Sequence, residues 1–384
     1  MNFYNLKVNF MREMKDRTKI IYGLFFVTFA VSVLSRLLFN GLMFNFDYGL
    51  YQPDGSHYFY RTLVFLGHDS ITASNQVADW YRVNGLKNNL FDPSILRPEN
   101  SQLWGLVSPR IFYSLLSVPF VWLVGAPGML VVPVVSFLVI CIVCFKFAMN
   151  YNSGSFALIM TFAISVSPTV LRWMISNVTD SLLCALFVIS AYIISLEIKD
   201  SKKFAWLMIL VVFTSITRFC LPIWLAIAGV WFINNKKRAG LFLVGISSVM
   251  SIPVFLSAPD DALLPGKNPI TIWEKISGLV ISFLKVGFYE VAELAALDRV
   301  LLVLLGLAIL ASFYRFKAIE SQYFLAVLLS VWLIGAINGT VGVNFRYQMP
   351  VLGFMFWVLS VNFSKFRNGI LGNRLNVISS KTQN

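Results

Sequence analysis

Residues 129–147, MLVVPVVSFLVICIVCFKF, decide the class of fold. This run carries one charged residue, Lys146, and is close to the ~20 apolar residues that a helix needs to cross the hydrocarbon core of a bilayer. Similar runs recur along the chain, so the sequence predicts an all-α polytopic membrane protein with about ten transmembrane helices. The other predicted spans are residues 20–44, 156–173, 181–197, 205–217, 221–232, 241–256, 300–316, 323–339 and 349–363.

The overall composition agrees with that class. Hydrophobic residues make up 58% of the chain and charged residues only 13%, with a mean hydropathy of +0.73, whereas a soluble domain carries about 25% charged residues. The formal net charge of +13 comes from Lys and Arg scattered in short clusters between the apolar runs. A nucleic-acid surface would need them along one face, so nucleic acid is excluded as a partner and membrane lipids are expected instead.

The short basic clusters predict which side of the membrane each loop faces, because cytoplasmic loops carry an excess of Lys and Arg. If residues 111–124 do not cross, every cluster falls on one side, so both termini are predicted to be cytoplasmic in a cytoplasmic (inner or plasma) membrane. This divides the chain into a basic N-terminus at 1–19, a single transmembrane domain at 20–363 and a basic tail at 364–384. The internal basic clusters are residues 199–203, 236–238 and 315–317.

The longest polar stretch lies at residues 45–109, and residues 45–128 are predicted to form the first extracytoplasmic loop. Within it, residues 58–66 and 71–80 have the aromatic and aliphatic faces typical of short helices that lie in the membrane interface. Residues 111–124 are apolar, but at about 14 residues with Pro119 among them they are short for a span. An interfacial or re-entrant helix is therefore predicted there.

A second extracytoplasmic segment is predicted at residues 257–299. Within it, residues 276–297 combine apolar positions with Lys285 and two glutamates, a pattern typical of an amphipathic helix. Successive loops face opposite sides of the membrane, with all basic clusters in the cytoplasm, only if residues 276–297 and 111–124 both stay out of the membrane or both cross it. The sequence leaves both arrangements open.

The most distinctive polar stretch is YQPDGSHY at residues 51–58, just after the first predicted span. Pro53 fixes the backbone before Asp54 and Gly55 frees it afterwards, so a turn is predicted that presents the carboxylate. A carboxylate held at the edge of a bilayer beside His57 suits proton abstraction or cation binding. The alternative is a solvated surface turn without a chemical role.

Further polar residues return to the same predicted side of the membrane. Charges at the ends of spans cluster at binding sites, although each one also has a structural alternative. Arg172 could pair with Asp180 within one loop, and Arg218 or Arg346 could simply reach the interface or a lipid headgroup. Together, two carboxylates and three arginines favour a site for an anionic, sugar-like or phosphate-bearing ligand.

The order of these motifs resembles the GT-C superfamily of membrane glycosyltransferases, which includes protein O-mannosyltransferases and lipid A aminoarabinose transferases. Members carry an acid in a long first extracytoplasmic loop, at a position similar to Asp54. A second acid opens a later span, as Asp180 does here. A Thr-Arg pair starts a short helix, as at Arg218, and Arg-Tyr followed by Pro precedes a late span, as at Arg346-Tyr347.

The resemblance implies transfer of a sugar from a polyprenyl-phosphate donor to an extracytoplasmic glycolipid, polysaccharide or protein. In that chemistry Asp54 acts as the general base, Asp180 orients sugar hydroxyls or tunes Asp54, and Arg218 and Arg346 stabilise the leaving phosphate. Asp54 has no acidic neighbour, unlike the paired acids of many members, so no metal ligand is assigned and a divalent cation (Mg²⁺ or Mn²⁺) stays open as a cofactor. The remaining candidates, His57, Tyr58, Arg61, Arg172 and Tyr347, are assigned to substrate binding.

Other function classes also fit a polytopic chain with a basic, aromatic outer face. A transporter or flippase of a lipid-linked sugar is one of them, and such proteins are expected to carry internal repeats and interrupted helices. A polysaccharide polymerase would handle a similar substrate, but its large loop usually falls late in the chain. A structural or assembly protein of the membrane is the third alternative.

Overall fold

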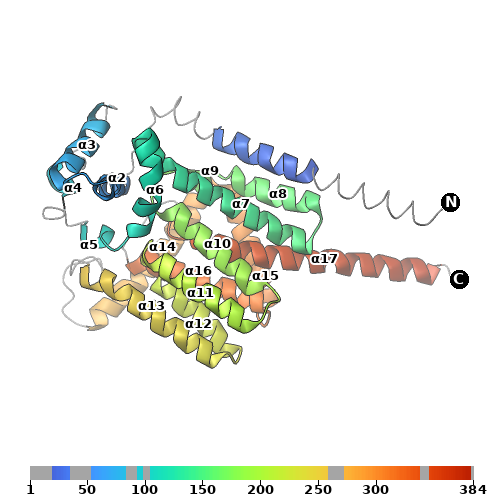
Figure 1. The fold of residues 1–384 in the computed structure, drawn as a ribbon. Coiled ribbons are helices and arrows are strands. Elements are labelled where there is room, and N and C mark those ends of the chain that lie inside the picture. Colours follow the sequence, from blue (N-terminus) through green and yellow to red (C-terminus); the bar gives the residue numbers. More distant parts are fainter. Residues whose placement is uncertain are drawn as a thin grey trace.

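A computed structural model describes residues 20–34, 53–83, 93–97, 104–257, 272–337 and 346–381 (Figure 1). These residues form helices and connecting turns, with no strand among them. The all-α class predicted from the sequence is therefore confirmed for this part of the chain. The basic N-terminus, the second half of the first predicted span and parts of both predicted extracytoplasmic segments lie outside the described residues.

The main bundle consists of apolar helices that begin with Ile20–Leu34. Four stretches are long and apolar enough to cross a membrane, and a fifth counts if the bent pair α8 and α9 is one span. For the described residues this is consistent with an integral membrane protein, and the number of about ten spans stays a prediction. The other helices of the bundle are α7 (Val131–Tyr151), α8 (Gly154–Ser165), α9 (Pro168–Met174), α10 (Asp180–Ser195), α11 (Asp200–Ser215), α12 (Leu221–Ile233), α13 (Lys237–Ser257), α14 (Ile272–Leu297), α15 (Arg299–Tyr314), α16 (Ile319–Ile337) and α17 (Leu352–Lys381).

The span predicted at residues 156–173 consists of two helices, α8 and α9, which meet at an angle of 68°. Pro168 begins α9 and cannot continue the hydrogen bonding of α8, because proline has no N–H group. Asp298, buried at the start of α15, accepts hydrogen bonds from the hydroxyl of Ser167 and from the backbone N–H of Thr169. A buried carboxylate from a distant helix therefore stabilises the bend.

The residues of the predicted first loop fold into a layer of short helices at one end of the bundle (Figure 1). Helices predicted at 58–66 and 71–80 are present, although each begins earlier in the chain than expected. The apolar helix with Pro119 inside it crosses the direction of α7 steeply, which favours the interfacial placement predicted for it. The layer comprises α2 (Pro53–Phe65), α3 (Ser70–Val83), α4 (Pro93–Leu96), α5 (Trp104–Val107) and α6 (Ile111–Val124).

The basic clusters lie at the other end of the bundle. The turns that join α7 to α8, α10 to α11 and α12 to α13 all lie opposite the layer of short helices in Figure 1. Two of these turns carry the clusters at 199–203 and 236–238, and Lys236 pairs with Asp200 at 2.7 Å. These two clusters therefore lie at the same end of the bundle, and the side of the membrane that this end faces stays a prediction.

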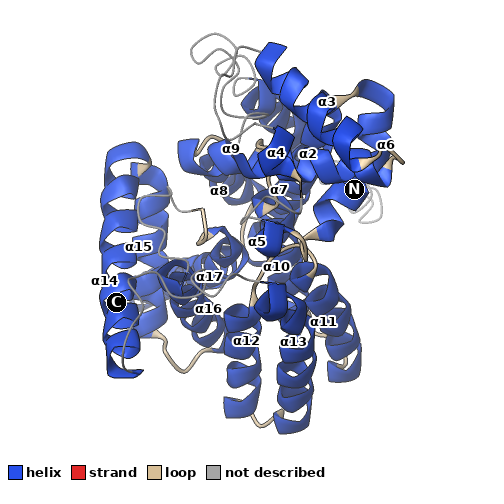
Figure 2. Ribbon diagram, turned by 90° about the vertical axis from the view of Figure 1, so that its left-hand side faces the viewer, coloured by secondary structure: helices blue, strands red, loops and turns tan. Residues whose placement is uncertain are grey.

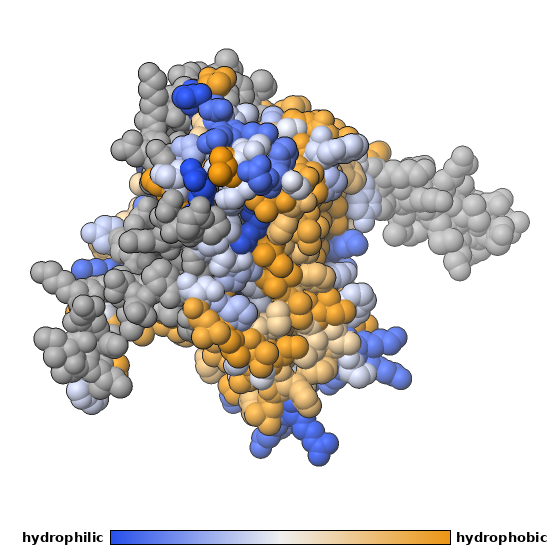
Figure 3. Space-filling model, turned by 60° about the vertical axis from the view of Figure 1, so that its left-hand side comes forward, coloured by the Kyte–Doolittle hydropathy of each residue, from blue (hydrophilic) through white to orange (hydrophobic). Residues whose placement is uncertain are grey.

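Apolar side chains cover much of the helix surface between those ends (Figure 3). The clearest case is α14, which lies beside α15 at the edge of the bundle in Figure 2. Its side chains Trp273, Leu284 and Phe288 are 75%, 66% and 71% exposed. Large apolar surfaces of this kind are unfavourable in water and suit contact with lipid.

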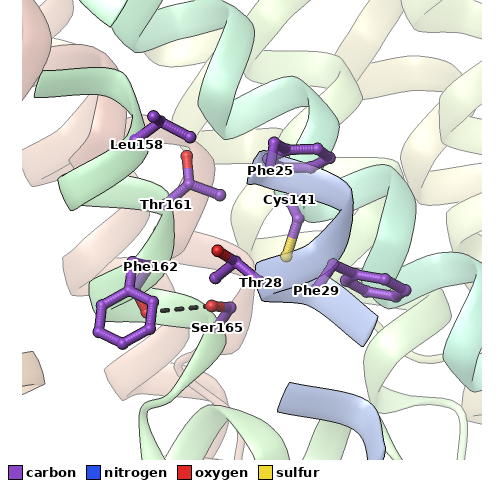
Figure 4. A pocket seen from close by; sticks show the side chains of 8 residues that line it. All are labelled: Phe25, Thr28, Phe29, Cys141, Leu158, Thr161, Phe162 and Ser165. Atoms are coloured by element: carbon purple, nitrogen blue, oxygen red, sulfur yellow. Dashed lines mark hydrogen bonds between the residues drawn. The ribbon is translucent and has the colours of Figure 1, made fainter. Parts of the chain in front are cut away.

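A small polar pocket lies where the first helix meets α7 and α8 (Figure 4). The hydroxyls of Thr28, Thr161 and Ser165 and the thiol of Cys141 line it, and Ser165 donates to the carbonyl of Phe162 at 3.0 Å. Its volume of about 10 Å³ is enough for about one water molecule. Like the other cysteines of the chain, Cys141 is a buried free thiol.

Reporter fusions test the predicted sides of the membrane. Fusions after residues 90 and 344 are expected to report an extracytoplasmic location, and fusions after residues 201 and 318 a cytoplasmic one, because Lys and Arg mark the cytoplasmic loops. The measurement is the activity of paired reporters that work on opposite sides of the membrane. A cytoplasmic signal at both 90 and 344 would contradict the predicted topology.

Candidate functional site

Asp54 lies in the first turn of α2, not in the isolated turn predicted from the sequence. Pro53 suits the first position of a helix, where an N–H group would have no partner in the helix, and an acidic residue is favoured near the positive end of the helix dipole. Gly55 follows, and a Cβ there would collide with the side-chain amide of Asn177 unless that amide moved. The start of α2 therefore packs directly against the loop before α10.

Asp180 begins α10 and is almost completely buried, with 1% of its side chain exposed. Each of its carboxylate oxygens accepts a hydrogen bond from an arginine. Oδ1 accepts from Arg218, which lies in the turn between α11 and α12, and Oδ2 accepts from Arg346 at 3.0 Å. Two guanidinium groups therefore compensate the charge of this buried carboxylate, as a buried charge requires.

Arg346 connects the two candidate aspartates. Its Nη2 lies 2.6 Å from Oδ2 of Asp54, and its Nε lies 3.0 Å from Oδ2 of Asp180. The result is a row of alternating charges, Asp54, Arg346, Asp180 and Arg218, drawn from four distant parts of the chain. We call this row the charge network. Asp54, with 33% of its side chain exposed, is its most accessible member.

Aromatic rings lie against both arginines of the charge network. The guanidinium of Arg218 is 4.3 Å from the ring centre of Tyr347, and that of Arg346 is 4.9 Å from the ring centre of Trp173. An arginine over an aromatic face gains cation–π stabilisation while its N–H donors stay available in the guanidinium plane. Trp173 belongs to α9, so the bend stabilised by Asp298 also positions one wall of the network.

The arginines also set the ionisation of Asp54. Burial would raise the pKa of its carboxyl group, but the charges of Arg346, Arg110 and Arg218 outweigh this effect and lower the pKa to about 2. Arg110, at the start of α6, also donates to the hydroxyl of Tyr58 at 3.3 Å. Asp54 is therefore ionised at neutral pH, and its charge is held mainly by Arg346.

Three buried polar side chains next to the charge network have no hydrogen-bond partner among the described residues. They are Thr179 and Ser181, which flank Asp180, and Gln348, two residues after Arg346. All three are 0% exposed. Buried polar groups in proteins are nearly always satisfied, so each of the three favours a bound water or another polar partner beside it.

A narrow cavity lies beside the charge network. Its volume of about 10 Å³ leaves room for about one water molecule while the arginines are engaged by the aspartates. A larger ligand would therefore have to displace one of these ion pairs. The apolar residues that line the cavity are Leu183, Phe219, Ile223, Ile334 and Pro350.

Several candidates from the sequence make contacts outside the charge network. His57 and Tyr58 are buried within α2, and Tyr58 packs edge-on against another tyrosine of the core. Arg61 donates to two backbone carbonyls between α5 and α6 and lies 4.6 Å from the ring centre of Trp104. Arg172 lies on α9, with its guanidinium 5.2 Å from the ring centre of the next residue. The assignment of these four residues to substrate binding stays a prediction.

The sequence analysis missed three residues that shape the site: Arg110, Trp173 and Asp298. A signal existed for Asp298, because an Asp directly before an apolar run is typical of a helix N-cap, and its side chain does accept from the N–H of Leu301. Its second role, at the bend before α9, depends on contacts between distant segments. Arg110 and Trp173 carry no comparable signal.

A divalent cation at this site would need oxygen ligands that are not already engaged. Asp54 and Asp180 are the carboxylates of the charge network, and guanidinium groups hold both of them. Across the described ranges, no group of three His, Cys, Asp or Glu side chains is placed to hold a metal ion. The residues as arranged therefore do not fit a metal, and the chemistry has to be derived from the side chains alone.

Comparisons with known proteins do not assign a family. No family model matches the chain, and no curated protein and no solved structure matches it either. The resemblance to the GT-C superfamily therefore rests only on the order of the motifs at Asp54, Asp180, Arg218 and Arg346-Tyr347, and on the predicted layout of spans around them. It stays a prediction.

Proposed function

We propose that this protein is a membrane glycosyltransferase, which moves a sugar from a polyprenyl-phosphate-linked donor to an extracytoplasmic acceptor. The charge network carries the proposal, because it combines two carboxylates and two arginines at one end of an apolar helix bundle. Buried charges in such a bundle are rare and are typical of binding and catalytic sites. Arginine suits the phosphate of the donor, and a carboxylate suits the hydroxyl of the acceptor.

The arginines serve the donor. Arg218 and Arg346 present planar forks of N–H donors, which bind phosphate oxygens in pairs. Apolar side chains beside them, such as Phe219 and Ile223, suit the hydrocarbon chain that adjoins the phosphate of a polyprenyl donor. Asp54 is the more exposed of the two carboxylates that hold Arg346, so an incoming phosphate displaces it first.

Asp54 serves the acceptor once Arg346 has turned to the phosphate. Its carboxylate takes the proton of the acceptor hydroxyl, while the acceptor oxygen forms a bond to the anomeric carbon of the sugar. The bond between that carbon and the phosphate oxygen breaks, and its electron pair leaves with the polyprenyl phosphate. Arg218 and Arg346 stabilise the negative charge that gathers there, and Asp180 holds the fork of Arg218 in place.

Displacement of Asp54 also makes it a better base. A carboxyl group with a pKa of about 2 is poorly matched to proton abstraction near neutral pH. Arg346 lowers that pKa more than the other arginines do, and phosphate binding draws Arg346 away from the carboxylate. The pKa of Asp54 then rises toward its ordinary value. The donor thereby activates the base that its own transfer requires.

A flippase or transporter of a lipid-linked sugar is the second candidate, and one observation favours it. Transporters carry helices that are interrupted near their substrate site. The bent pair α8 and α9 is such an interruption, and Trp173 of α9 lies against Arg346. A flippase moves the lipid-linked sugar without breaking a bond, so the release of free polyprenyl phosphate distinguishes the two functions.

Transfer by the reconstituted protein tests the proposal. Vesicles with a radiolabelled polyprenyl-phosphate sugar and an extract of cell-envelope lipids and glycans are expected to release polyprenyl phosphate and to label an acceptor. Arg346→Lys is expected to lower this transfer by about 10- to 100-fold, because lysine keeps the charge but loses one charge-assisted hydrogen bond of the fork. The initial rate of label transfer at several donor concentrations gives the measurement.

Arg315→Lys is the matched control. Arg315 pairs with Glu320, in the first turn of α16, at 3.2 Å. The same substitution there removes a guanidinium group from an ion pair outside the charge network. It is expected to leave transfer unchanged. Equal transfer by Arg346→Lys and the parent would contradict the phosphate-binding role of Arg346. Movement of the lipid-linked sugar without any released polyprenyl phosphate would contradict the glycosyltransferase and support the flippase.

A further inference from the structure

A groove of about 370 Å³ lies between α2, α3 and the end of α6, outside the charge network. Buried side chains of Phe59, Leu63 and Val121 line it, and two tryptophans complete its apolar lining. One of them, Trp80, packs edge-on against Phe59 with ring centres 6.2 Å apart. A volume of this size is within the usual range of sites that bind small molecules.

The lining of the groove favours a hydrocarbon chain. Apart from the single indole N–H of each tryptophan, the polar side chains among the described lining residues are those of His68 and Gln76, and both are at least partly exposed. A free sugar would need many hydrogen-bond partners for its hydroxyls, and the buried part of the groove has none to offer. The arrangement suits an amphiphile whose chain lies in the groove and whose polar headgroup lies near His68 and Gln76.

The groove is continuous with an exposed apolar surface at the end of α6. Trp122, which lines the groove, is followed by Leu123 and Val124, and the three side chains are 73%, 66% and 60% exposed. Such a run is unfavourable in water and suits the edge of a bilayer, where tryptophan is enriched. A lipid chain therefore enters the groove sideways from the membrane.

Helix α2 runs from the charge network to the groove. Phe59 and Leu63 of α2 line the groove, together with Leu66 in the turn that follows the helix. Asp54 begins the same helix, roughly 8 to 18 Å along its axis from the groove residues. One rigid element thus connects the groove to the carboxylate proposed as the base.

We propose that this groove holds a hydrocarbon chain of the acceptor, so that the acceptor is a membrane lipid with a hydroxyl-bearing headgroup. The inference rests on the proposed glycosyltransferase function. The donor has its own apolar surface beside Arg218, formed by residues such as Phe219 and Ile223. The groove beside α2 is therefore left for the second substrate, and Asp54 begins the helix that lines it.

Photo-crosslinking tests the groove without requiring catalysis. The full chain is reconstituted with a phospholipid that carries a diazirine in one acyl chain, and labelled peptides are mapped after irradiation. Leu66→Trp fills the groove and is expected to reduce the labelling of α2 and α6 several-fold. Val64→Trp is the matched control, because Val64 lies two residues before Leu66, near the end of α2, and is exposed without lining the groove. Labelling of the exposed face of α14 serves as the internal standard.

The same variants test the acceptor role. Leu66→Trp is expected to raise the KM for a long-chain lipid acceptor and to leave the KM for a short-chain, water-soluble analogue unchanged. Unaltered labelling of α2 and α6 in Leu66→Trp would overturn the groove as a lipid site. Loss of the labelling on addition of excess polyprenyl phosphate would show the donor chain in the groove and overturn the acceptor assignment. Normal labelling without any sugar transfer would instead overturn the proposed function, and the acceptor role with it, while lipid binding by the groove would stand.

Discussion

Asp54→Asn is expected to lower sugar transfer by about 10²- to 10⁴-fold, the usual contribution of a general base. The amide nearly matches the carboxylate in shape and keeps an oxygen that accepts from Arg346, which retains Asp180 as its charged partner. The fold is therefore expected to persist, but the amide cannot take up a proton. Transfer by reconstituted protein measures the loss, and thermal unfolding of the same preparation reports the state of the fold.

Two further variants test whether Asp54 acts as a general base or only as the ion-pair partner of Arg346. Asp54→Glu keeps the carboxylate but moves it by one methylene, so a small residual activity is expected, because catalysis is sensitive to positioning at this scale. Asp79→Asn is the matched surface control, since Asp79 on α3 pairs only with the exposed Arg82 in the contacts described here. It is expected to leave transfer unchanged. Sugar transfer by Asp54→Asn at the rate of the parent would contradict the role of Asp54 as the general base.

Asp180→Asn is expected to destabilise the fold by about 3–5 kcal/mol, because it leaves a buried arginine without its compensating charge. Asp180 and Arg218 have only 1% and 6% of their side chains exposed. The double variant Asp180→Asn, Arg218→Gln removes both charges and is expected to recover much of the lost stability, since no uncompensated buried ion remains. In one detergent, the unfolding temperature should be highest for the parent, lower for the double variant and lowest for Asp180→Asn.

Asp200→Asn provides the control for this series. Asp200 pairs with Lys236 at 2.7 Å, but their side chains are 60% and 38% exposed, and a surface pair contributes only about 0–1 kcal/mol. The unfolding temperature of Asp200→Asn should therefore stay close to that of the parent. A double variant no more stable than Asp180→Asn would contradict the pairing of Asp180 with Arg218. Per folded molecule, Asp180→Asn should lose less transfer than Asp54→Asn, because Asp180 only positions an arginine.

Hydropathy predicted the helices where polarity interrupts the apolar runs, and it failed where only hydrogen bonding does. Arg218 separates two apolar runs, and α11 and α12 do end and begin on either side of it. Ser167 and Pro168 lie in a run that stays apolar around them, and the one span predicted there contains a bend of 68° in the structure. Pro168 marks the place of the bend in the sequence, but the contact with Asp298, 131 residues further along the chain, is not visible in a single sequence.

The members of the charge network could be predicted because charges at the ends of apolar spans are conspicuous. Their pairing could not, because it depends on how the helices pack. The sequence suggested Arg172 as a partner of Asp180 through proximity in the chain, whereas the bonds described for Asp180 come from Arg218 and Arg346. The burial of Tyr58 was likewise not predicted, because the periodicity of α2 does not show which of its faces packs on the rest of the protein.

Several of the described helices of the bundle are short for a bilayer, α10, α12 and α15 among them. α10 has 16 residues, α12 has 13 and α15 has 16, so at 1.5 Å per residue they measure roughly 24, 20 and 24 Å, against ~30 Å of hydrocarbon. Hydrophobic mismatch of this size is relieved by thinning of the surrounding bilayer. The membrane is then expected to dip toward the protein near the start of α12, which lowers the headgroup plane toward Arg218. The acyl-chain length of the host membrane thereby sets how far a lipid phosphate has to travel to reach that arginine.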